Sequence, residues 1–164
     1  WDAAGVQPQL SPPLLHDGAL RFYYYGGPAF HGSRFLKGQF QLGLAQLRPD
    51  GFASLRAAWR TGIVTTKPFK WPGGKLVVNG QERGGSRTRE ASLRVAILDE
   101  SGNPIRGYVE SNCKPLEGDF PAGRPTWSQG EQNLDPLIGS TIRLRFFLKQ
   151  AEIFSFRADD GNDR

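Results

Sequence analysis

Cysteine and histidine are scarce in this chain, and their scarcity limits the chemistry that the chain can carry. One cysteine and two histidines occur among 164 residues. A single cysteine, Cys113, excludes an intrachain disulfide, and an unpaired cysteine is more often a small buried hydrophobe than a nucleophile. His16 lies in a predicted turn and is expected at the surface. His31 follows a glycine-rich segment and has no obvious partner in the sequence.

Long apolar runs and long helical periods are also absent. No apolar stretch approaches the roughly 18 residues that a membrane helix requires, and no signal-type segment opens the chain. Because the chain begins at Trp1-Asp2, we expect a mature or excised piece whose targeting segment lies outside it. No apolar period of 3.6 residues persists for more than about two turns, which argues against a helical fold.

Familiar catalytic and cofactor motifs are missing as well. No nucleophile elbow is present, and Gly84-Gly85-Ser86 lacks the lysine and the following helix of a phosphate loop. Paired acids occur only in a turn, a loop and a polar tail, and no carboxylate series has the spacing of an EF-hand. These pairs are Asp99 with Glu100, Glu117 with Asp119, and Asp159 with Asp160. We predict no catalytic residue, no cofactor and no metal site, with a structural calcium at Glu117 and Asp119 left open.

The chain is basic without a concentrated basic motif. Its formal net charge is +5, from 21 Lys and Arg against 16 Asp and Glu. The densest basic stretch, residues 67–94, is interrupted by Glu82 and Glu90 and contains only Phe69 and Trp71 as aromatics. Nucleic-acid surfaces combine denser basic clusters with aromatic rings. We therefore predict a solvated basic face, with neither nucleic acid nor a membrane as partner.

Period-two alternation recurs along the chain and predicts strands. Residues 141–148 alternate most regularly, with Ile142 and Leu144 facing one way and Arg143 and Arg145 the other. Turn formers at residues 16–18 and 48–51 separate such segments. The predicted strands are residues 20–25, 39–47, 52–58, 62–67, 75–79, 91–98 and 141–148, with 151–157 as the hairpin partner of 141–148 and weaker candidates at 105–109 and 125–127.

About ten short antiparallel strands joined by turns indicate an all-β fold, specifically a β-sandwich of the jelly-roll or concanavalin-like type. We predict N-terminal strands at residues 1–48, packed on a sandwich at residues 49–158, and a polar tail at 159–164. Residues 68–74 and 81–90 are predicted loops. The predicted core contains Phe22, Leu44, Leu93, Val95, Ile97, Ile142, Leu144 and Phe146.

A series of segments in order resembles one region of known proteins. These segments resemble the C-terminal β-sandwich of five-bladed β-propeller proteins related to glycoside hydrolase families 32 and 43. They are Asp50-Gly51-Phe52-Ala53-Ser54-Leu55, Thr65-Thr66-Lys67-Pro68, Leu76-Val77-Val78-Asn79, Leu93-Arg94-Val95-Ala96-Ile97-Leu98-Asp99, Pro104-Ile105-Arg106-Gly107-Tyr108 and Ile142-Arg143-Leu144-Arg145-Phe146. Upstream, Phe22-Tyr23-Tyr24-Tyr25-Gly26-Gly27, His31 and Leu42-Gly43-Leu44-Ala45 resemble the last propeller blade of such proteins.

The resemblance implies a non-catalytic carbohydrate-binding or accessory module that belongs with a glycoside hydrolase and is secreted or periplasmic. The catalytic acids of those enzymes lie in earlier blades, which this chain lacks. A glycan or polysaccharide is then the expected partner. Two alternatives stay open: a structural domain that packs on a propeller or on a second copy of the chain, and a small polysaccharide hydrolase or lyase.

Exposed aromatic rings are the candidate sugar contacts, because sugars present apolar C–H faces. Trp71, in the predicted loop 68–74, is the first candidate for an exposed ring, and Trp59 at a strand end is the second. Tyr23 and Tyr25 share a strand face with Arg21. Arg21 and His31 would supply hydrogen bonds.

Overall fold

The structure, a computed structural model, describes residues 2, 4–28, 40–83, 91–128 and 133–161. The chain is all-β, and every strand pairing is antiparallel, as the sequence predicts. It divides into two compact units, unit 1 at Trp1–Gly51 and unit 2 at Phe52–Arg164. Each unit is described by itself.

The described residues of unit 1 form a four-stranded sheet, sheet A, built around β3 (Ala19–Gly27). β4 (Gln41–Leu47) pairs along one edge of β3, and β1 (Gly5–Pro8) and β2 (Leu14–His16) share the other edge. The turn from β2 to β3 has positive φ at Asp17 (49°) and Gly18 (70°). This is the backbone form that tight hairpins require, and it confirms the turn predicted at residues 16–18.

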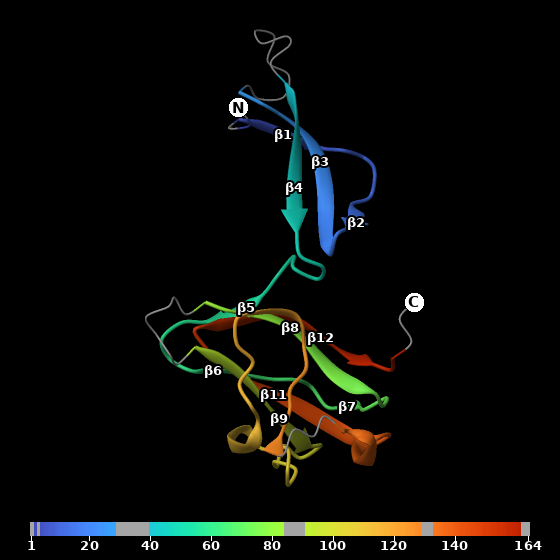
Figure 1. Cartoon of the computed structure of the whole chain (residues 1–164), viewed down its shortest axis with the longest axis vertical. Coiled ribbons are helices and arrows are strands. Elements are labelled where there is room, and N and C mark those ends of the chain that lie inside the picture. Colours follow the sequence, from blue (N-terminus) through green and yellow to red (C-terminus); the bar gives the residue numbers. More distant parts are fainter. Residues whose placement is uncertain (1, 3, 29–39, 84–90, 129–132, 162–164) are drawn as a thin grey trace. The chain divides into compact units, whose positions relative to one another are not determined.

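Unit 2 is a β-sandwich of two four-stranded layers, sheet B and sheet C (Figure 1). Sheet B has the order β10 (Asp119–Gly123), β8 (Lys75–Glu82), β12 (Ala151–Asp159) and β5 (Leu55–Ala57). Sheet C is centred on β11 (Thr141–Lys149), with β9 (Ser92–Asp99) on one edge and β6 (Gly62–Thr65) and β7 (Phe69–Lys70) sharing the other. The short 3-10 helices η1 (Glu110–Asn112) and η3 (Asp135–Leu137) lie in the connections. The finer jelly-roll or concanavalin-like assignment stays a prediction.

The core lies between sheets B and C. Alternation along β11 buries Ile142, Leu144, Phe146 and Leu148 and leaves the residues between them partly exposed. The core prediction is confirmed for Leu93, Val95, Ile97, Ile142, Leu144 and Phe146, each at most 1% exposed.

The two core residues predicted in unit 1 differ from this pattern. Leu44 is 46% exposed, so its predicted burial is wrong, and Phe22 is only half-buried. Both lie on sheet A, which has no second layer among the described residues of unit 1. Alternation identifies the two faces of a strand, but a face is buried only where another layer covers it.

The predicted hairpin between residues 141–148 and 151–157 is wrong. β11 belongs to sheet C and β12 to sheet B, and a single residue, Gln150, joins them. Gln150 has φ 45° and donates its backbone N–H to Ala58 O at 2.9 Å. This single residue in the left-handed conformation leads the chain from sheet C to sheet B, so β11 and β12 pair with other strands and not with each other.

Residues 104–127 protect the free edge of β9 without forming a regular strand beside it. Leu93 exchanges two backbone hydrogen bonds with Leu116, and Ile97 N–H donates to Tyr108 O. At Val95, the N–H contacts Cys113 Sγ at 3.3 Å and the carbonyl accepts from Trp127 Nε1 at 2.9 Å. The strands predicted at residues 105–109 and 125–127 do not form. Isolated bridges at Pro104 and Trp127 occur instead. The backbone groups of β9 named above nevertheless have hydrogen-bond partners along this edge.

Candidate binding surface

The outward face of sheet C carries basic side chains and two hollows. Because strand side chains alternate, burial of Leu144 and Phe146 turns Arg145 and Phe147 outward. The register places Ile63 of β6 and Arg94 of β9 on either side of Phe147. Directly opposite residues share a face. Phe147 therefore lies between an exposed aliphatic side chain (Ile63, 61% exposed) and a guanidinium.

Two hollows adjoin on this face. One, of about 350 Å³, lies toward the Ser92 end of β9, and the other, of about 290 Å³, lies toward Leu98. Both are lined by Phe147 and Glu110, so we treat them together as the sheet C groove. Its lining residues are Thr61, Ala91, Ser92, Arg94, Ala96, Leu98, Pro104, Val109, Glu110, Ser111, Pro115, Glu117, Arg145, Phe147 and Lys149.

The groove has a floor of strand residues and a wall of loop residues. The floor comes from β9 and β11, and the wall is the segment from Pro104 to Glu117, including η1. The backbone bonds of this segment to Leu93 and Ile97 fix the wall against the edge of β9. Both the floor and the wall of the groove are therefore held in place by the sandwich.

The outward face of sheet C, which includes the floor of the groove, is strongly basic. Cross-strand register and alternation place Lys70, Arg94, Arg143, Arg145 and Lys149 on the outward face of sheet C. Arg145 Nε donates to Thr65 Oγ1 at 3.1 Å, and Arg143 Nε donates to Glu100 O at 3.0 Å. Neither Arg94 nor Arg145 forms an ion pair with any residue that the structure describes. Glu110 and Glu117 contribute the carboxylates of the wall.

The expectation of an exposed ring at Trp71 is wrong. Trp71 is 1% exposed and belongs to the hydrophobic core, where its ring lies 6.5 Å from that of Phe69. Its backbone N–H donates to Ser140 O at 3.0 Å, and its carbonyl accepts from Gly139 N–H at 2.9 Å. The segment 69–71 therefore extends alongside the start of β11 in place of the predicted loop, and the ring cannot stack on a sugar.

The tyrosine face predicted on unit 1 does exist, but it is more apolar than the sequence alone suggests. The register brings Tyr23 opposite Leu44, Tyr25 opposite Leu42, and Arg21 opposite Leu14 and Gln46. Tyr25 is 48% exposed, and the three leucines are exposed as well. Arg21 pairs with Asp17 at 3.2 Å. These residues form the tyrosine-leucine face of sheet A: Leu14, Arg21, Tyr23, Tyr25, Leu42 and Leu44.

The other two predicted candidates are separate from these surfaces. Trp59, on the connection between β5 and β6, is 75% exposed, as predicted for a ring available to a ligand. His31 lies outside the described residues. The structure brings Arg21, Tyr23 and Tyr25 onto one sheet face, and Trp71 and Trp59 belong to the other unit.

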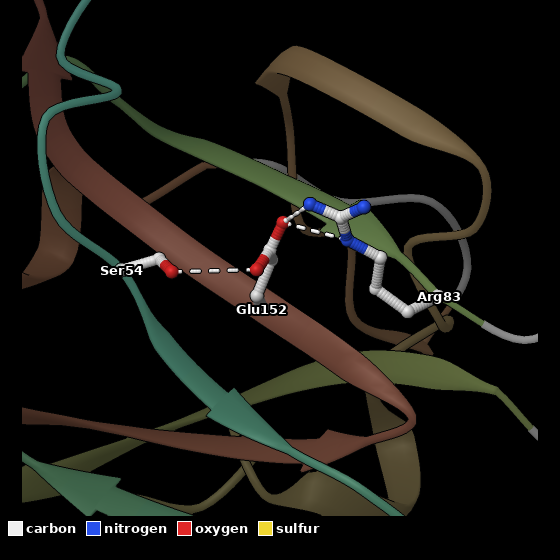
Figure 2. A network of polar contacts seen from close by, with 3 residues as sticks. All are labelled: Ser54, Arg83 and Glu152. Atoms are coloured by element: carbon white, nitrogen blue, oxygen red, sulfur yellow. Dashed lines mark hydrogen bonds and ion pairs between the residues drawn. The ribbon is translucent and has the colours of Figure 1, made fainter. Parts of the chain in front are cut away.

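A buried polar cluster lies on sheet B, centred on Glu152 (Figure 2). Glu152 is 4% exposed, and its Oε1 accepts from Arg83 Nε at 2.8 Å and is also in contact with Arg83 Nη2. Ser54 Oγ donates to the other oxygen, Oε2, at 3.3 Å. Figure 2 shows Ser54 and Arg83 approaching the carboxylate from opposite sides. Both oxygens therefore have a hydrogen-bond donor, and Arg83 pairs with Oε1. The contacts of Glu152 are those of a structural ion pair, not of a general acid.

The acid pairs considered in the sequence lie apart from the groove, except Glu117. Asp99 is held in a turn, where Asn103 N–H donates to it at 2.8 Å, and this bond is the main reason that its pKa lies below the ordinary value. Asp159 belongs to β12 and not to the predicted tail; the Gly161 N–H and Arg124, at 2.9 Å, lower its pKa. In the described ranges, no three His, Cys, Asp or Glu side chains gather closely enough to hold a metal ion.

Sequence reasoning missed the sheet C groove, although the signal for its floor was present. The alternation in residues 141–148 identifies core residues, and its other half contains Arg145 and Phe147, which line the groove. The wall could not be found in the same way, because Glu110 and Glu117 reach the groove through an irregular segment that alternation does not describe.

Comparisons with protein-family models, with curated proteins and with solved structures give no match for this chain. None of the helices in the described part of the chain is long and apolar enough to cross a membrane.

Proposed function

We propose that the protein is a non-catalytic carbohydrate-binding accessory module, associated with a glycoside hydrolase, whose glycan site is the sheet C groove. The observation that carries the proposal is the position of Phe147, which lines both hollows of the groove with Arg94 directly opposite on β9. Glycan sites in proteins combine an apolar or aromatic surface for the C–H faces of sugar rings with a few polar groups that orient the hydroxyl groups.

The polar groups around Phe147 include both donors and acceptors. Arg94 and Arg145 supply guanidinium N–H groups, and Glu110 supplies a carboxylate that lines both hollows. A sugar hydroxyl is both donor and acceptor, so a site with both kinds of partner can satisfy it. The rigid strands beneath these side chains favour a preformed site.

This site replaces the one predicted from the sequence around Trp71, which the core encloses. Tyr23, Tyr25 and Trp59 stay candidates for further sugar contacts, because their rings retain exposed surface. The assignment as an accessory module also rests on the resemblance to the C-terminal sandwich of propeller-type glycoside hydrolases, in which the catalytic acids lie outside this region.

The test is binding of the full chain to a panel of soluble and insoluble polysaccharides, with release of reducing ends assayed in the same samples. We expect binding without release. Phe147→Ala should weaken binding about tenfold, which corresponds to about 1.4 kcal/mol. Phe52→Ala removes a phenylalanine that is 71% exposed outside the groove and serves as the matched control. Equal affinity of both variants and the parent chain would remove the groove from the proposal.

The same assay tests the enzymatic alternative. Glu110 and Glu117 line one hollow of the groove, and glycoside hydrolysis uses two carboxyl groups across the scissile bond. Turnover by the pure chain that is lost in Glu110→Gln or Glu117→Gln would identify a hydrolase or lyase and overturn the non-catalytic assignment.

A second candidate function is structural, and the exposed apolar faces of sheet A favour it. Both faces of this single-layer sheet carry exposed apolar side chains: Leu14, Tyr25, Leu42 and Leu44 on one face, and Val6 and Leu15 on the other. Among the described residues of unit 1, only three glycines are buried. A lone sheet of this kind needs a covering layer for stability. A propeller domain or a second copy of the chain would provide one.

The interface role is tested by the oligomeric state of the chain over a range of concentrations, measured by light scattering after size-exclusion chromatography. A dimer that dissociates in a Tyr23→Ser, Tyr25→Ser double variant, in a chain without polysaccharide affinity, would favour this role. A concentration-independent monomer would remove the homo-oligomer from consideration.

A further inference from the structure

The charges of the two sheets of unit 2 differ. The strands of sheet C carry five cationic side chains and one carboxylate, whereas those of sheet B carry three cationic side chains and four carboxylates. The single carboxylate of sheet C, Asp99, lies at the end of β9 opposite Ile142, on the inward side of the alternation. The strands therefore contribute positive charge and no negative charge to the outward face of sheet C.

The arginines of this face are anchored in a way that leaves their terminal groups available. Arg143 and Arg145 each donate from Nε, to Glu100 O and Thr65 Oγ1. Within the described part of the chain, no ion pair engages the Nη groups of Arg145 or the guanidinium of Arg94. Guanidinium groups bind carboxylates and sulfates more strongly than neutral hydroxyl groups, because the hydrogen bonds are charge-assisted.

The cations also extend in a line. Successive outward residues of a strand are about 6.7 Å apart, so Arg143, Arg145, Phe147 and Lys149 form a row along β11, with Arg94 beside it on β9. A row of cations interrupted by one aromatic ring is complementary to a chain ligand that carries repeated negative charges and apolar C–H faces.

We propose that the glycan bound in the sheet C groove is acidic: a polysaccharide that carries carboxylate or sulfate groups, recognised by Arg94, opposite Phe147 on β9, and by Arg145, two residues before Phe147 on β11. This inference rests on the proposed function and specifies its ligand class. Phe147 contacts the apolar face of a sugar ring, and the two guanidinium groups bind acidic substituents of the chain.

The wall of the groove favours an acidic glycan over a nucleic acid. Glu110 and Glu117 are hydrogen-bond acceptors, and the hydroxyl groups of a glycan can donate to them, whereas a phosphodiester backbone has no donor to offer. Single-stranded nucleic acids bind on several exposed aromatic rings. Of the outward strand residues of sheet C, Phe147 is the only aromatic, and it is half-buried.

The experiment compares a matched pair of ligands on the full chain by isothermal titration calorimetry. Polygalacturonate supplies the acidic polymer, and its carboxyl-reduced form is a neutral polymer with the same linkages. We expect at least tenfold tighter binding of the acidic polymer, with affinity that falls as the salt concentration rises. A sulfated galactan tests whether sulfate substitutes for carboxylate.

Two variants with equal charge change separate a defined site from general attraction to a basic protein. Arg145→Gln alters the groove, and Arg56→Gln removes a cation from β5 of sheet B. We expect Arg145→Gln to lose about tenfold in affinity for the acidic polymer and Arg56→Gln to lose less than about twofold. Equal losses in the two variants would show non-specific attraction and overturn the inference.

The remaining outcomes distinguish failure of this inference from failure of the proposed function. Equal affinity for both polymers, lost in Phe147→Ala, would refute the acidic ligand and keep the glycan site. No binding of any polysaccharide would refute both. Tighter binding of single-stranded oligonucleotides than of every acidic glycan, lost in Arg145→Gln, would assign the face to nucleic acid.

Discussion

At the scale of single residues, Cys113 illustrates how burial controls chemistry. Its thiol is 3% exposed and lies against Val95 N–H, and burial raises its pKa above the ordinary value of 9.0. A thiol with a raised pKa has little of the reactive thiolate at neutral pH. We expect no reaction of the native chain with a chromogenic disulfide reagent at pH 8 and one equivalent of thiol after unfolding in denaturant. Rapid labelling of the folded chain would contradict the burial of this thiol.

Two isoleucines of sheet C provide a matched test of the core. Ile142 is fully buried on β11, and Ile63 is 61% exposed on β6. We expect Ile142→Ala to lower the free energy of unfolding by about 2 to 5 kcal/mol through lost burial and a residual cavity. Ile63→Ala should change it by only about 0.5 kcal/mol, as surface substitutions do. Urea denaturation followed by tryptophan fluorescence measures both, and equal losses would contradict the assigned inward and outward faces.

At the scale of elements, the turn between β11 and β12 sets the sandwich topology. Gln150 has φ 45°, a conformation that β-branched residues rarely adopt. We expect Gln150→Val to be less stable than Gln150→Gly by roughly 1 to 3 kcal/mol, the cost of holding a non-glycine residue in the left-handed region. Both variants lose the glutamine side chain, so their difference isolates the backbone. Equal unfolding midpoints in urea would show that the turn relaxes without cost.

The elements that could be predicted from the sequence were those in which one face is buried and the other solvated. β11 satisfies this condition along its length, and β9 satisfies it only in its first half, because residues 95–98 are buried on both faces. β7 contains only two residues, too few for a period, and the following Pro72-Gly73-Gly74 indicated a loop. Trp71 was consequently expected at the surface, although its pairing with residues 139 and 140 places it in the core.

Only part of the candidate site could be predicted from the sequence. Arg145 and Phe147 lie on the predicted outward face of a predicted strand, so the floor of the groove follows from local alternation. The neighbours Ile63 and Arg94 depend on which strands pair with β11, and residues 151–157, which were expected there, pair in the other sheet. Strand pairing depends on contacts distant in sequence, which a local period does not encode.

At the scale of the whole molecule, the two units differ in what stabilises them. Unit 2 has a continuous core between two sheets, whereas the side chains described in unit 1 are at most half-buried. Local stability follows buried apolar contact, so the hydrogen bonds of sheet A should open far more often than those of sheets B and C.

Hydrogen–deuterium exchange of the full chain, followed by mass spectrometry of its peptides, measures this difference. We expect peptides of β9, β11 and β12 to retain their amide protons longest and peptides of β3 and β4 to exchange at least about tenfold faster, since 1.4 kcal/mol of opening free energy corresponds to a factor of ten. Slow exchange of sheet A in dilute solution would mean that a covering layer is already present. Dependence of that protection on protein concentration would identify the layer as a second copy of the chain, and concentration-independent protection would attribute it to contacts within one chain.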